Sequence, residues 1–134
     1  MTENFVLFLD HQVIFQLPEI NRGGSPIIYD RTKTSRFGIL RKRDINESGI
    51  LWIDVPNVFC FHLYNAWEED DDTIVVIGSC MNPPDSIFSG SEDPTRTELT
   101  KIQLNMRMGE SSRKVIVLGM NLETGQVTEP IVRK

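Results

Sequence analysis

The sequence predicts an all-β protein, on the basis of three observations. Short runs of β-branched and aromatic residues recur along the chain, and turn-forming residues separate them about every ten residues. No stretch of ten residues has the apolar spacing of a convincing amphipathic helix. The chain has 134 residues, of which 40% are hydrophobic and 25% are charged, which is enough for one compact domain. A sandwich, a barrel and a propeller all fit this pattern.

The strands expected in the first half are short and separated by breakers. Two apolar runs flank Asp10–Gln12 with the spacing of a β-hairpin, and a second hairpin is expected around the polar stretch 30–36. Pro18 and the loop 22–26 separate these two hairpins. The strands expected from these patterns are 5–9, 13–17, 27–29, 37–40 and 50–55.

The strands expected in the second half are 58–64, 73–78, 99–106 and 115–118. The first of them has β-forming residues on both faces, which is typical of an interior strand. The first two form a hairpin whose tip is the run of carboxylates Glu68–Asp72, and the last two form another hairpin. Between the two hairpins, a long loop is expected over 82–94, where prolines and acidic residues accumulate.

Charge and composition exclude several classes of protein. The net charge of −5, without a basic patch, argues against nucleic-acid binding as the main function. No apolar run approaches the ~18 residues that span a bilayer, so an integral membrane protein is not expected. Cys60 and Cys80 are too few for a disulfide-rich scaffold. Both lie in apolar, strand-like segments and are expected to be reduced and buried, although one bridge is possible.

His62 is the most informative single residue, because it lies in the middle of an apolar strand where burial is expected. A buried imidazole needs a partner for each ring nitrogen. Two interpretations meet that need. In the first, His62 is a core histidine held by backbone carbonyls and a carboxylate. In the second, it is a metal ligand whose other nitrogen donates to a carboxylate behind it.

Four other features are weaker candidates for chemistry. The carboxylates Glu68–Asp72 lack the ligand spacing and glycine of an EF-hand and are expected to be a solvated tip. His11 lies in a turn and is expected on the surface. The loop Arg22–Ser25 lacks the pattern of a phosphate-binding loop. Cys60 and His62 are two residues apart, which places them on the same face of a regular strand, but a buried Cys60 is expected to be inert.

The segment Asn57–Glu69, with the sequence NVFCFHLYNAWEE, resembles the carotenoid cleavage dioxygenases of plants, and among them the 9-cis-epoxycarotenoid dioxygenases. Further matches follow in order along nearly the whole chain. They are Thr2–Phe5, Arg22–Pro26, Ser35–Ile39, Val76–Met81, Pro84–Phe88, Gly109–Arg113 and Asn121–Glu123.

This resemblance implies a seven-bladed β-propeller with an axial iron(II) held by four histidines and supported by three glutamates. It implies that His62 is the third iron ligand, that Glu123 holds a ligand imidazole, and that Phe61 lines the substrate tunnel. Strict alternation points Phe61 away from His62, so the role of Phe61 requires the strand to twist there. Residues 1–134 are then expected to form a single partial propeller domain of about two to three blades, truncated at both ends.

The function implied by the resemblance is oxidative cleavage of a carotenoid double bond with iron(II) and molecular oxygen. In close relatives the substrate is a 9-cis-epoxycarotenoid and the product is xanthoxin, the precursor of abscisic acid. A chloroplast location and peripheral membrane contact of the full-length protein are implied in the same way. Only His62 matches an iron-ligand position, so a truncated, inactive pseudo-enzyme or interaction fragment lacking three of the four ligands remains an alternative. An unrelated β-sandwich with a core His62 is a further one.

Overall fold

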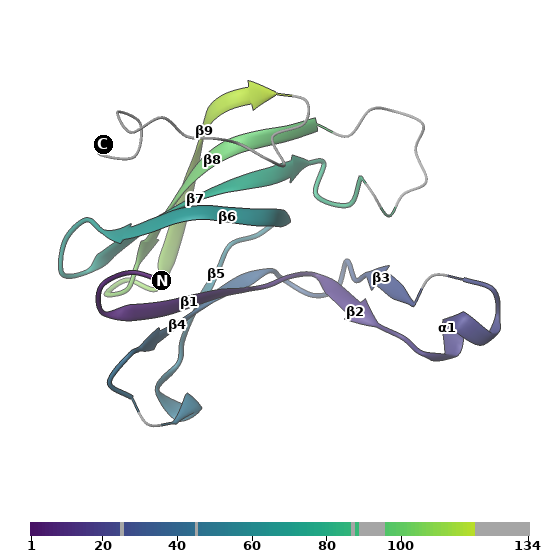
Figure 1. Cartoon of the computed structure of the whole chain (residues 1–134), viewed down its shortest axis with the longest axis horizontal. Coiled ribbons are helices and arrows are strands. Elements are labelled where there is room, and N and C mark those ends of the chain that lie inside the picture. Colours follow the sequence, from purple (N-terminus) through teal and green to yellow (C-terminus); the bar gives the residue numbers. More distant parts are fainter. Residues whose placement is uncertain (25, 45, 87, 89–95, 120–134) are drawn as a thin grey trace.

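The protein folds into three antiparallel sheets, as seen in a computed structural model that describes residues 1–24, 26–44, 46–86, 88 and 96–119 (Figure 1). The first sheet has the order β1 (Phe5–Asp10), β4 (Arg36–Arg41), β5 (Leu51–Asp54). The second pairs β2 (Val13–Phe15) with β3 (Ile27–Tyr29). The third has the order β6 (Cys60–Glu68), β7 (Thr73–Asn82), β8 (Arg96–Asn105), β9 (Glu110–Gly119). The helical elements are short: α1 (Pro18–Asn21) and the 3-10 turn η1 (Glu47–Gly49).

The all-β prediction and the position of every expected strand are confirmed, but the expected pairing of the first half is wrong. β1 does not pair with β2 across Asp10–Gln12; it pairs with β4, and β2 pairs with β3. The two strands instead follow one another along one line in Figure 1. The Asp10 carboxylate supports the observed pairing, because it forms ion pairs with Lys33 (2.6 Å), just before β4, and with Arg36 (3.0 Å), the first residue of β4.

The hydrophobic core lies between the first and third sheets. On β7 and β8, residues of one face pair across the strands, with Ile74 opposite Leu104 and Val76 opposite Ile102. These four side chains are at most 1% exposed and pack in the same cluster as Phe37 and other residues of the first sheet. The two sheets are therefore held together by a single apolar interface.

Hydrogen bonds at the sheet edges join the two sheets at several points. The Glu68 carboxylate, at the end of β6, accepts bonds from the Thr2 hydroxyl (2.6 Å) and from the backbone and side-chain nitrogens of Asn4 (2.7 and 2.8 Å). Within the first sheet, the buried Ser35 hydroxyl donates to the Val55 carbonyl at 2.7 Å, which holds the start of β4 against the end of β5. These polar residues lie in segments that carry the family resemblance, and they have clear structural roles here.

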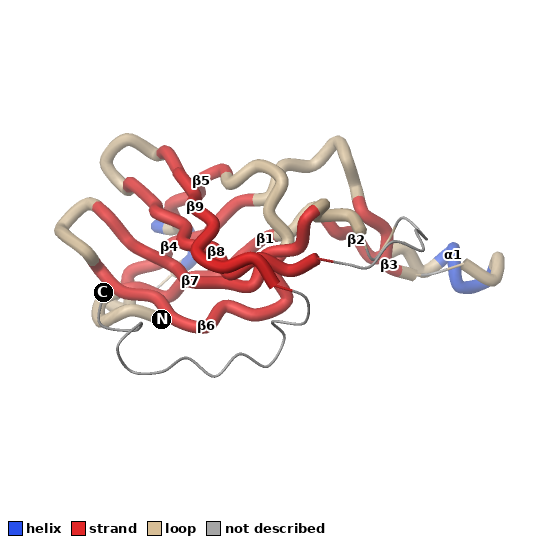
Figure 2. Tube along the Cα trace, turned by 90° about the horizontal axis from the view of Figure 1, so that it is seen from above, coloured by secondary structure: helices blue, strands red, loops and turns tan. Residues whose placement is uncertain are grey.

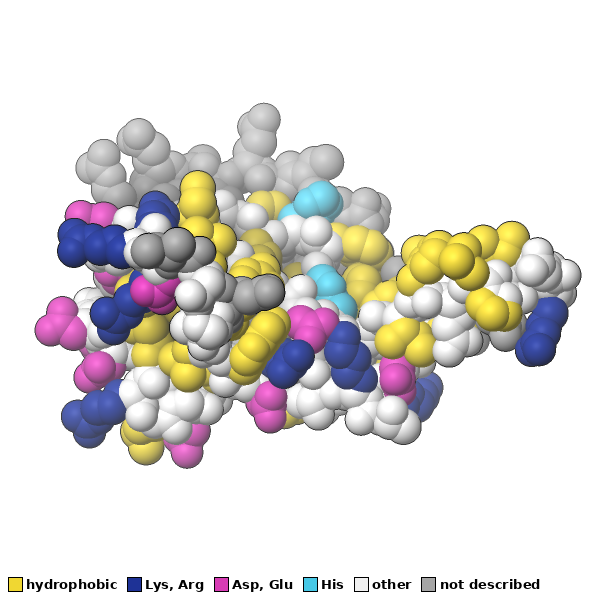
Figure 3. Space-filling model, turned by 90° about the horizontal axis from the view of Figure 1, so that it is seen from below, with side chains coloured by type: hydrophobic (Ala, Val, Ile, Leu, Met, Phe, Trp, Pro, Cys, Tyr) yellow, Lys and Arg dark blue, Asp and Glu magenta, His cyan; other side chains and the backbone are white. Residues whose placement is uncertain are grey.

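The segment β2–α1–β3 extends away from the two larger sheets (Figure 2). Several large apolar side chains on it are exposed, including Phe15 (64%), Leu17 (62%) and Ile20 (49%). Figure 3 shows hydrophobic side chains along this projecting part. In the part of the chain that the structure describes, no helix has the length and apolar character needed to cross a bilayer.

Candidate metal-binding site

The start of β6 is irregular, and this irregularity decides where the candidate residues lie. Cys60 is opposite Cys80 on β7, whereas His62 is opposite Ser79, so the register shifts by one at Phe61. A second shift follows between Leu63 and Asn65. Such a β-bulge inserts one residue that has no partner and changes the direction of the side chains after it.

The bulge corrects the expectation that Cys60 and His62 share a face. Cross-strand partners lie on the same face of a sheet. Cys80 and Ser79 are neighbours on the regular strand β7, so they point to opposite faces, and their partners Cys60 and His62 do so too. Cys60 therefore joins the core, and His62 lies on the other face of the sheet.

His62 is exposed, so the expected burial of this imidazole is wrong for this chain. Its ring stacks on that of Tyr64, with 6.4 Å between the ring centroids and 26° between the planes. Among the described residues, no hydrogen bond engages its ring nitrogens. The neighbouring Ser79 is 2% exposed, and its hydroxyl also has no hydrogen-bond partner in the described part of the chain. This face thus presents an available imidazole beside a buried, unpaired hydroxyl.

The prediction that this strand is interior is wrong, and this explains the exposure of His62. Among the described strands, β6 lies at the edge of the four-stranded sheet. Phe61 and Leu63 are 44% and 40% exposed on either side of His62. Apolar side chains do lie on both faces of this strand. Such a strand normally has neighbours that bury both faces, but the described residues do not supply a neighbour on its outer side.

Phe61 is the unpaired residue of the bulge, and it belongs to an aromatic cluster. Its ring meets Phe59 edge to face at 5.1 Å, and Phe59 in turn meets Phe88 at 5.6 Å. A role for Phe61 in lining a tunnel beside His62 requires the strand to depart from strict alternation of its side chains. The register shift at Phe61 is such a departure. The cluster gives this end of β6 an apolar, aromatic surface.

His11 is half-buried, so the expectation of a surface imidazole is wrong. Its Nε2 accepts a hydrogen bond from the Cys60 backbone N–H at 3.3 Å, and its ring lies 4.5 Å from that of Phe59. Burial lowers the pKa of His11, because it disfavours the charged imidazolium. A neutral ring with Nε2 as acceptor carries its proton on Nδ1. No spacing signal in the sequence linked His11 to a residue 49 positions away.

Cys60 and Cys80 are both free and buried, as expected. The neighbouring Cys80 thiol, together with burial, raises the pKa of Cys60. The interaction with Cys60 lowers the pKa of Cys80. The two buried thiols therefore influence each other's ionisation.

The carboxylate run separates into two parts with different roles. Glu68 belongs to β6 and binds the N-terminal segment, whereas Asp70, Asp71 and Asp72 are exposed at the hairpin tip. Within the described residues, no group of three or more His, Cys, Asp or Glu side chains is arranged to hold a metal ion. Glu123, the expected partner of an iron-binding imidazole, lies outside the described residues. The roles of His62, Phe61 and Glu123 remain predictions.

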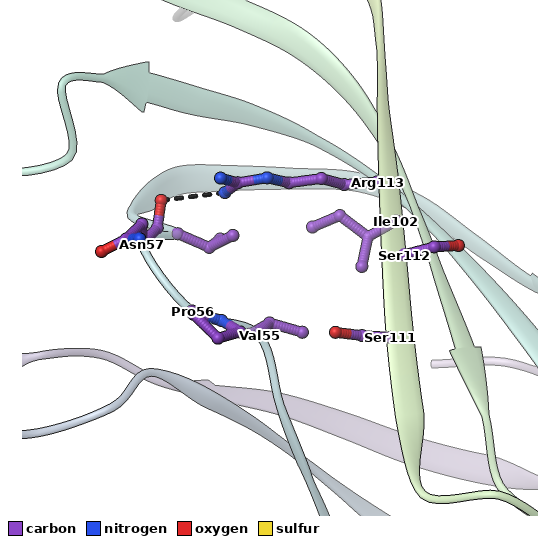
Figure 4. Close-up of a pocket in the computed structure, with 8 residues that line it drawn as sticks. Val55, Pro56, Asn57, Ile102, Ser111, Ser112 and Arg113 are labelled. Carbon is purple, nitrogen blue, oxygen red and sulfur yellow. Dashed lines mark hydrogen bonds between the residues drawn. The ribbon is translucent and has the colours of Figure 1, made fainter.

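A cavity of about 280 Å³ lies between the β5–β6 connection and β9, on the core side of the sheet (Figure 4). Arg113 reaches across it and donates to the Asn57 carbonyl at 2.9 Å. Asn57 has a left-handed backbone (φ 58°), and Ser111 on β9 donates to the Asp54 carbonyl at 2.6 Å. These bonds hold the connection that leads into β6, so the residues around this cavity have a structural role.

Comparisons with known proteins agree with this arrangement of sheets. The chain superimposes on mutant and cobalt-substituted Synechocystis apocarotenoid oxygenase with TM-scores of 0.67 and 0.66, at 18% and 19% identity, covering 87% of this chain and 26% of those chains. Lignostilbene dioxygenase of Pseudomonas brassicacearum matches with a TM-score of 0.53 at 12% identity, over 87% of this chain and 39% of that one. The fold is therefore that of a partial carotenoid-oxygenase propeller, as predicted.

Sequence comparisons define the family. The model of the retinal pigment epithelial membrane protein family (RPE65) matches residues 1–134. A chloroplastic 9-cis-epoxycarotenoid dioxygenase of Arabidopsis thaliana is 58% identical over 136 residues, covering 98% of this chain and 24% of that protein. A carotenoid 9,10(9',10')-cleavage dioxygenase of Crocus sativus is 35% identical over 119 residues, which cover 85% of this chain and 22% of that protein. The chain belongs to the RPE65/carotenoid oxygenase family, and it spans about a quarter of the length of these relatives. This membership corrects the alternative of an unrelated β-sandwich.

Proposed function

We propose that this chain forms part of a non-haem iron dioxygenase that cleaves a carotenoid double bond, and that His62 is one of its iron ligands. The observation that carries the proposal is the bulge at Phe61. It leaves the His62 ring exposed and without a hydrogen bond among the described residues, beside an aromatic cluster. An imidazole in this condition is able to coordinate a metal.

The described residues supply one candidate imidazole ligand for iron, His62, but not the four histidines that the family resemblance implies. Imidazole is a common ligand of first-row transition metals, including iron. His11 does not add a second ligand as it stands, because its Nε2 already accepts the Cys60 N–H. Glu123 would complete the outer part of the site by accepting a hydrogen bond from the N–H of a ligand imidazole, which fixes the tautomer of the ring and raises its basicity.

Iron(II) supplies the electron-transfer chemistry that allows molecular oxygen to react with a carbon–carbon double bond. In the balanced reaction, one double bond and one dioxygen molecule give two carbonyl groups, so no further reductant is needed. The part assigned to this chain is to hold the metal through His62 and to keep water away from an apolar polyene. The exposed Phe61 and the Phe59 ring beside it suit the second task, because aromatic faces pack against a conjugated chain.

The substrate that we propose is a 9-cis-epoxycarotenoid. The product would be xanthoxin, the precursor of abscisic acid. This rests on 58% identity with the 9-cis-epoxycarotenoid dioxygenase of Arabidopsis. A chloroplast location is proposed on the same ground, because that relative carries the description chloroplastic.

Peripheral membrane contact is proposed through the projecting β2–α1–β3 segment. Phe15, Leu17 and Ile20 are exposed there, and no apolar side chain of the described residues covers them. Exposed apolar side chains on a projecting element favour shallow insertion into a lipid surface. Co-sedimentation with phospholipid vesicles tests this: a Phe15→Asp, Leu17→Asp variant is expected to remain in the supernatant, and equal sedimentation of both proteins would contradict the proposal.

The catalytic proposal is tested by transplanting residues 1–134 into the matching segment of the Arabidopsis 9-cis-epoxycarotenoid dioxygenase. Loss of epoxycarotenoid absorbance and the formation of aldehyde products report cleavage. The chimera is expected to be active, and His62→Ala in the chimera is expected to lower both iron content and cleavage by at least about 100-fold. Glu123→Gln is expected to lower them by about 10-fold or more.

Arg107→Ala is the matched control, because Arg107 is exposed in the β8–β9 turn. It is expected to leave iron content and cleavage unchanged. Full iron content and activity in the His62→Ala chimera would overturn the assignment of His62. A correctly folded but inactive chimera would favour the alternative, in which this chain is a pseudo-enzyme or interaction fragment.

A further inference from the structure

Cys60 and Cys80 lie directly opposite each other on neighbouring antiparallel strands. The Met81 N–H donates to the Phe59 carbonyl at 2.8 Å, so the adjacent Cys60–Cys80 pair is a non-hydrogen-bonded one. The Cys60 N–H agrees with this, because it points to His11 Nε2 instead of β7. In such pairs the Cα atoms are about 4.5 Å apart, within the range of about 4.4–6.8 Å that a disulfide spans.

The surroundings of the two sulfur atoms allow them to approach each other. Gly78 lies two residues before Cys80 on the same face of β7. A Cβ at that position would lie 3.3 Å from Cys60 Sγ and 3.0 Å from Leu63 Cδ2. The absence of that Cβ leaves space for the Cys60 side chain on the face that it shares with Cys80. Both cysteines are largely shielded, with exposures of 3% and 6%.

A route for a small oxidant leads to Cys80. This residue lines a cavity of about 460 Å³ together with Asn57, Asn82, Thr100 and Arg113. Cys60 does not line this cavity. The arrangement thus has one thiol that a small molecule can reach and a second thiol directly behind it.

We propose that Cys60 and Cys80 are a redox modification site that forms a reversible cross-strand disulfide with a low-molecular-weight disulfide as the oxidant. Cys80 loses its proton, and its thiolate attacks one sulfur of the oxidant. A mixed disulfide forms and one thiolate leaves. The Cys60 thiol then loses its proton, and its thiolate attacks Cys80 Sγ and releases the second thiolate. Two protein thiols are oxidised to one disulfide, and one oxidant is reduced to two thiols.

The proposed bond would tie the edge strand β6 to β7 immediately before the bulge that precedes His62. It would close the loop between residues 60 and 80, which restricts the unfolded chain. This inference rests on the strand register and does not depend on the proposed iron chemistry. It therefore stands or falls separately from the assignment of His62.

Equilibration of the 134-residue chain with mixtures of reduced and oxidised glutathione tests the proposal. One sample is kept in native buffer and one in urea, both are quenched with acid, and the disulfide is quantified by peptide mass mapping. In the native chain, the equilibrium constant for the Cys60–Cys80 bond is expected to exceed that in urea by at least about 100-fold, because the strands hold the thiols together.

Equal constants in the two samples would overturn the proposal, as would a native chain that carries only glutathione adducts or disulfides between two chains. Cys60→Ala is the matched variant: it keeps the reachable Cys80 and removes the resolving thiol. It is expected to accumulate the Cys80–glutathione mixed disulfide. An unmodified Cys80 in this variant would contradict the assigned order of attack.

Discussion

The two ends of β6 differ in the regularity of their pairing with β7. The irregular end carries the candidate metal ligand, and the regular end stabilises the fold. At the start, two register shifts lie within Cys60–Asn65, and the side chains of Phe61, His62 and Leu63 are exposed. At the end, residues from Asn65 to Glu68 pair regularly with β7, and Glu68 receives three hydrogen bonds from the N-terminal segment. One end of the strand holds the two sheets together, and the other presents side chains that the described structure does not use.

The largest effect is expected from Gly78→Val, which tests whether the bulged end depends on close approach by β7. The Cβ alone would lie 3.0 Å from Leu63 Cδ2 and 3.3 Å from the His62 carbonyl oxygen. Overpacking of this kind costs about 1–3 kcal/mol. Urea unfolding monitored by tryptophan fluorescence measures the loss. An unchanged midpoint would show that the backbone around His62 moves freely to accommodate the new side chain.

The next effect is expected from Glu68→Gln at the regular end. Hydrogen bonds to a charged group contribute more than neutral ones, and the substitution removes the charge of this half-buried side chain, so a loss of about 1–2 kcal/mol is expected. The same unfolding experiment measures it. Asp71→Asn, at the exposed hairpin tip, removes a carboxylate three residues away and is expected to have almost no effect. Equal effects of the two substitutions would contradict the role assigned to Glu68.

A smaller effect is expected from pH. Hydrogen bonds from Thr2, and then from Asn4, lower the pKa of Glu68 below the ordinary value of 4.5. A carboxylate whose pKa is lower in the folded state stabilises the fold fully above its unfolded pKa, and this contribution is lost as the pH falls through the folded value. The difference in unfolding free energy between wild type and Glu68→Gln is therefore expected to shrink between about pH 5 and pH 3. A constant difference would contradict this linkage.

The sequence predicted the strands much better than their partners, and the reason is physical. Apolar and aromatic runs report local preference for extended structure, and each of the nine expected runs is a strand. The pairing of β1 with β4 depends on contacts between distant residues, such as those of Asp10 with Lys33 and Arg36, which are more than 20 residues away. Pattern along a single strand contains no information about such contacts.

The candidate site shows the same limit. The residues of the site followed from family resemblance, whereas their geometry follows from the bulge at Phe61, which no local preference marks. The alternation rule placed Cys60 and His62 on one face because it assumes a regular ladder. His11 was overlooked as a contact of Cys60 because it lies in a different sheet region and has no motif of its own.

The smallest effect on stability is expected from His62→Ala, and this is the sharpest test of the contrast within β6. The ring is exposed, and the described residues offer it only the stacked Tyr64 ring. Removal of an exposed side chain away from caps, cores and ion pairs usually changes stability by less than about 0.5 kcal/mol. Urea unfolding of the isolated chain is expected to give overlapping curves for wild type and variant. If His62 were a structural residue, the variant would instead lose stability on the scale of Glu68→Gln. A residue that contributes little to the fold, yet whose loss removes iron and cleavage from the chimera, has a functional role.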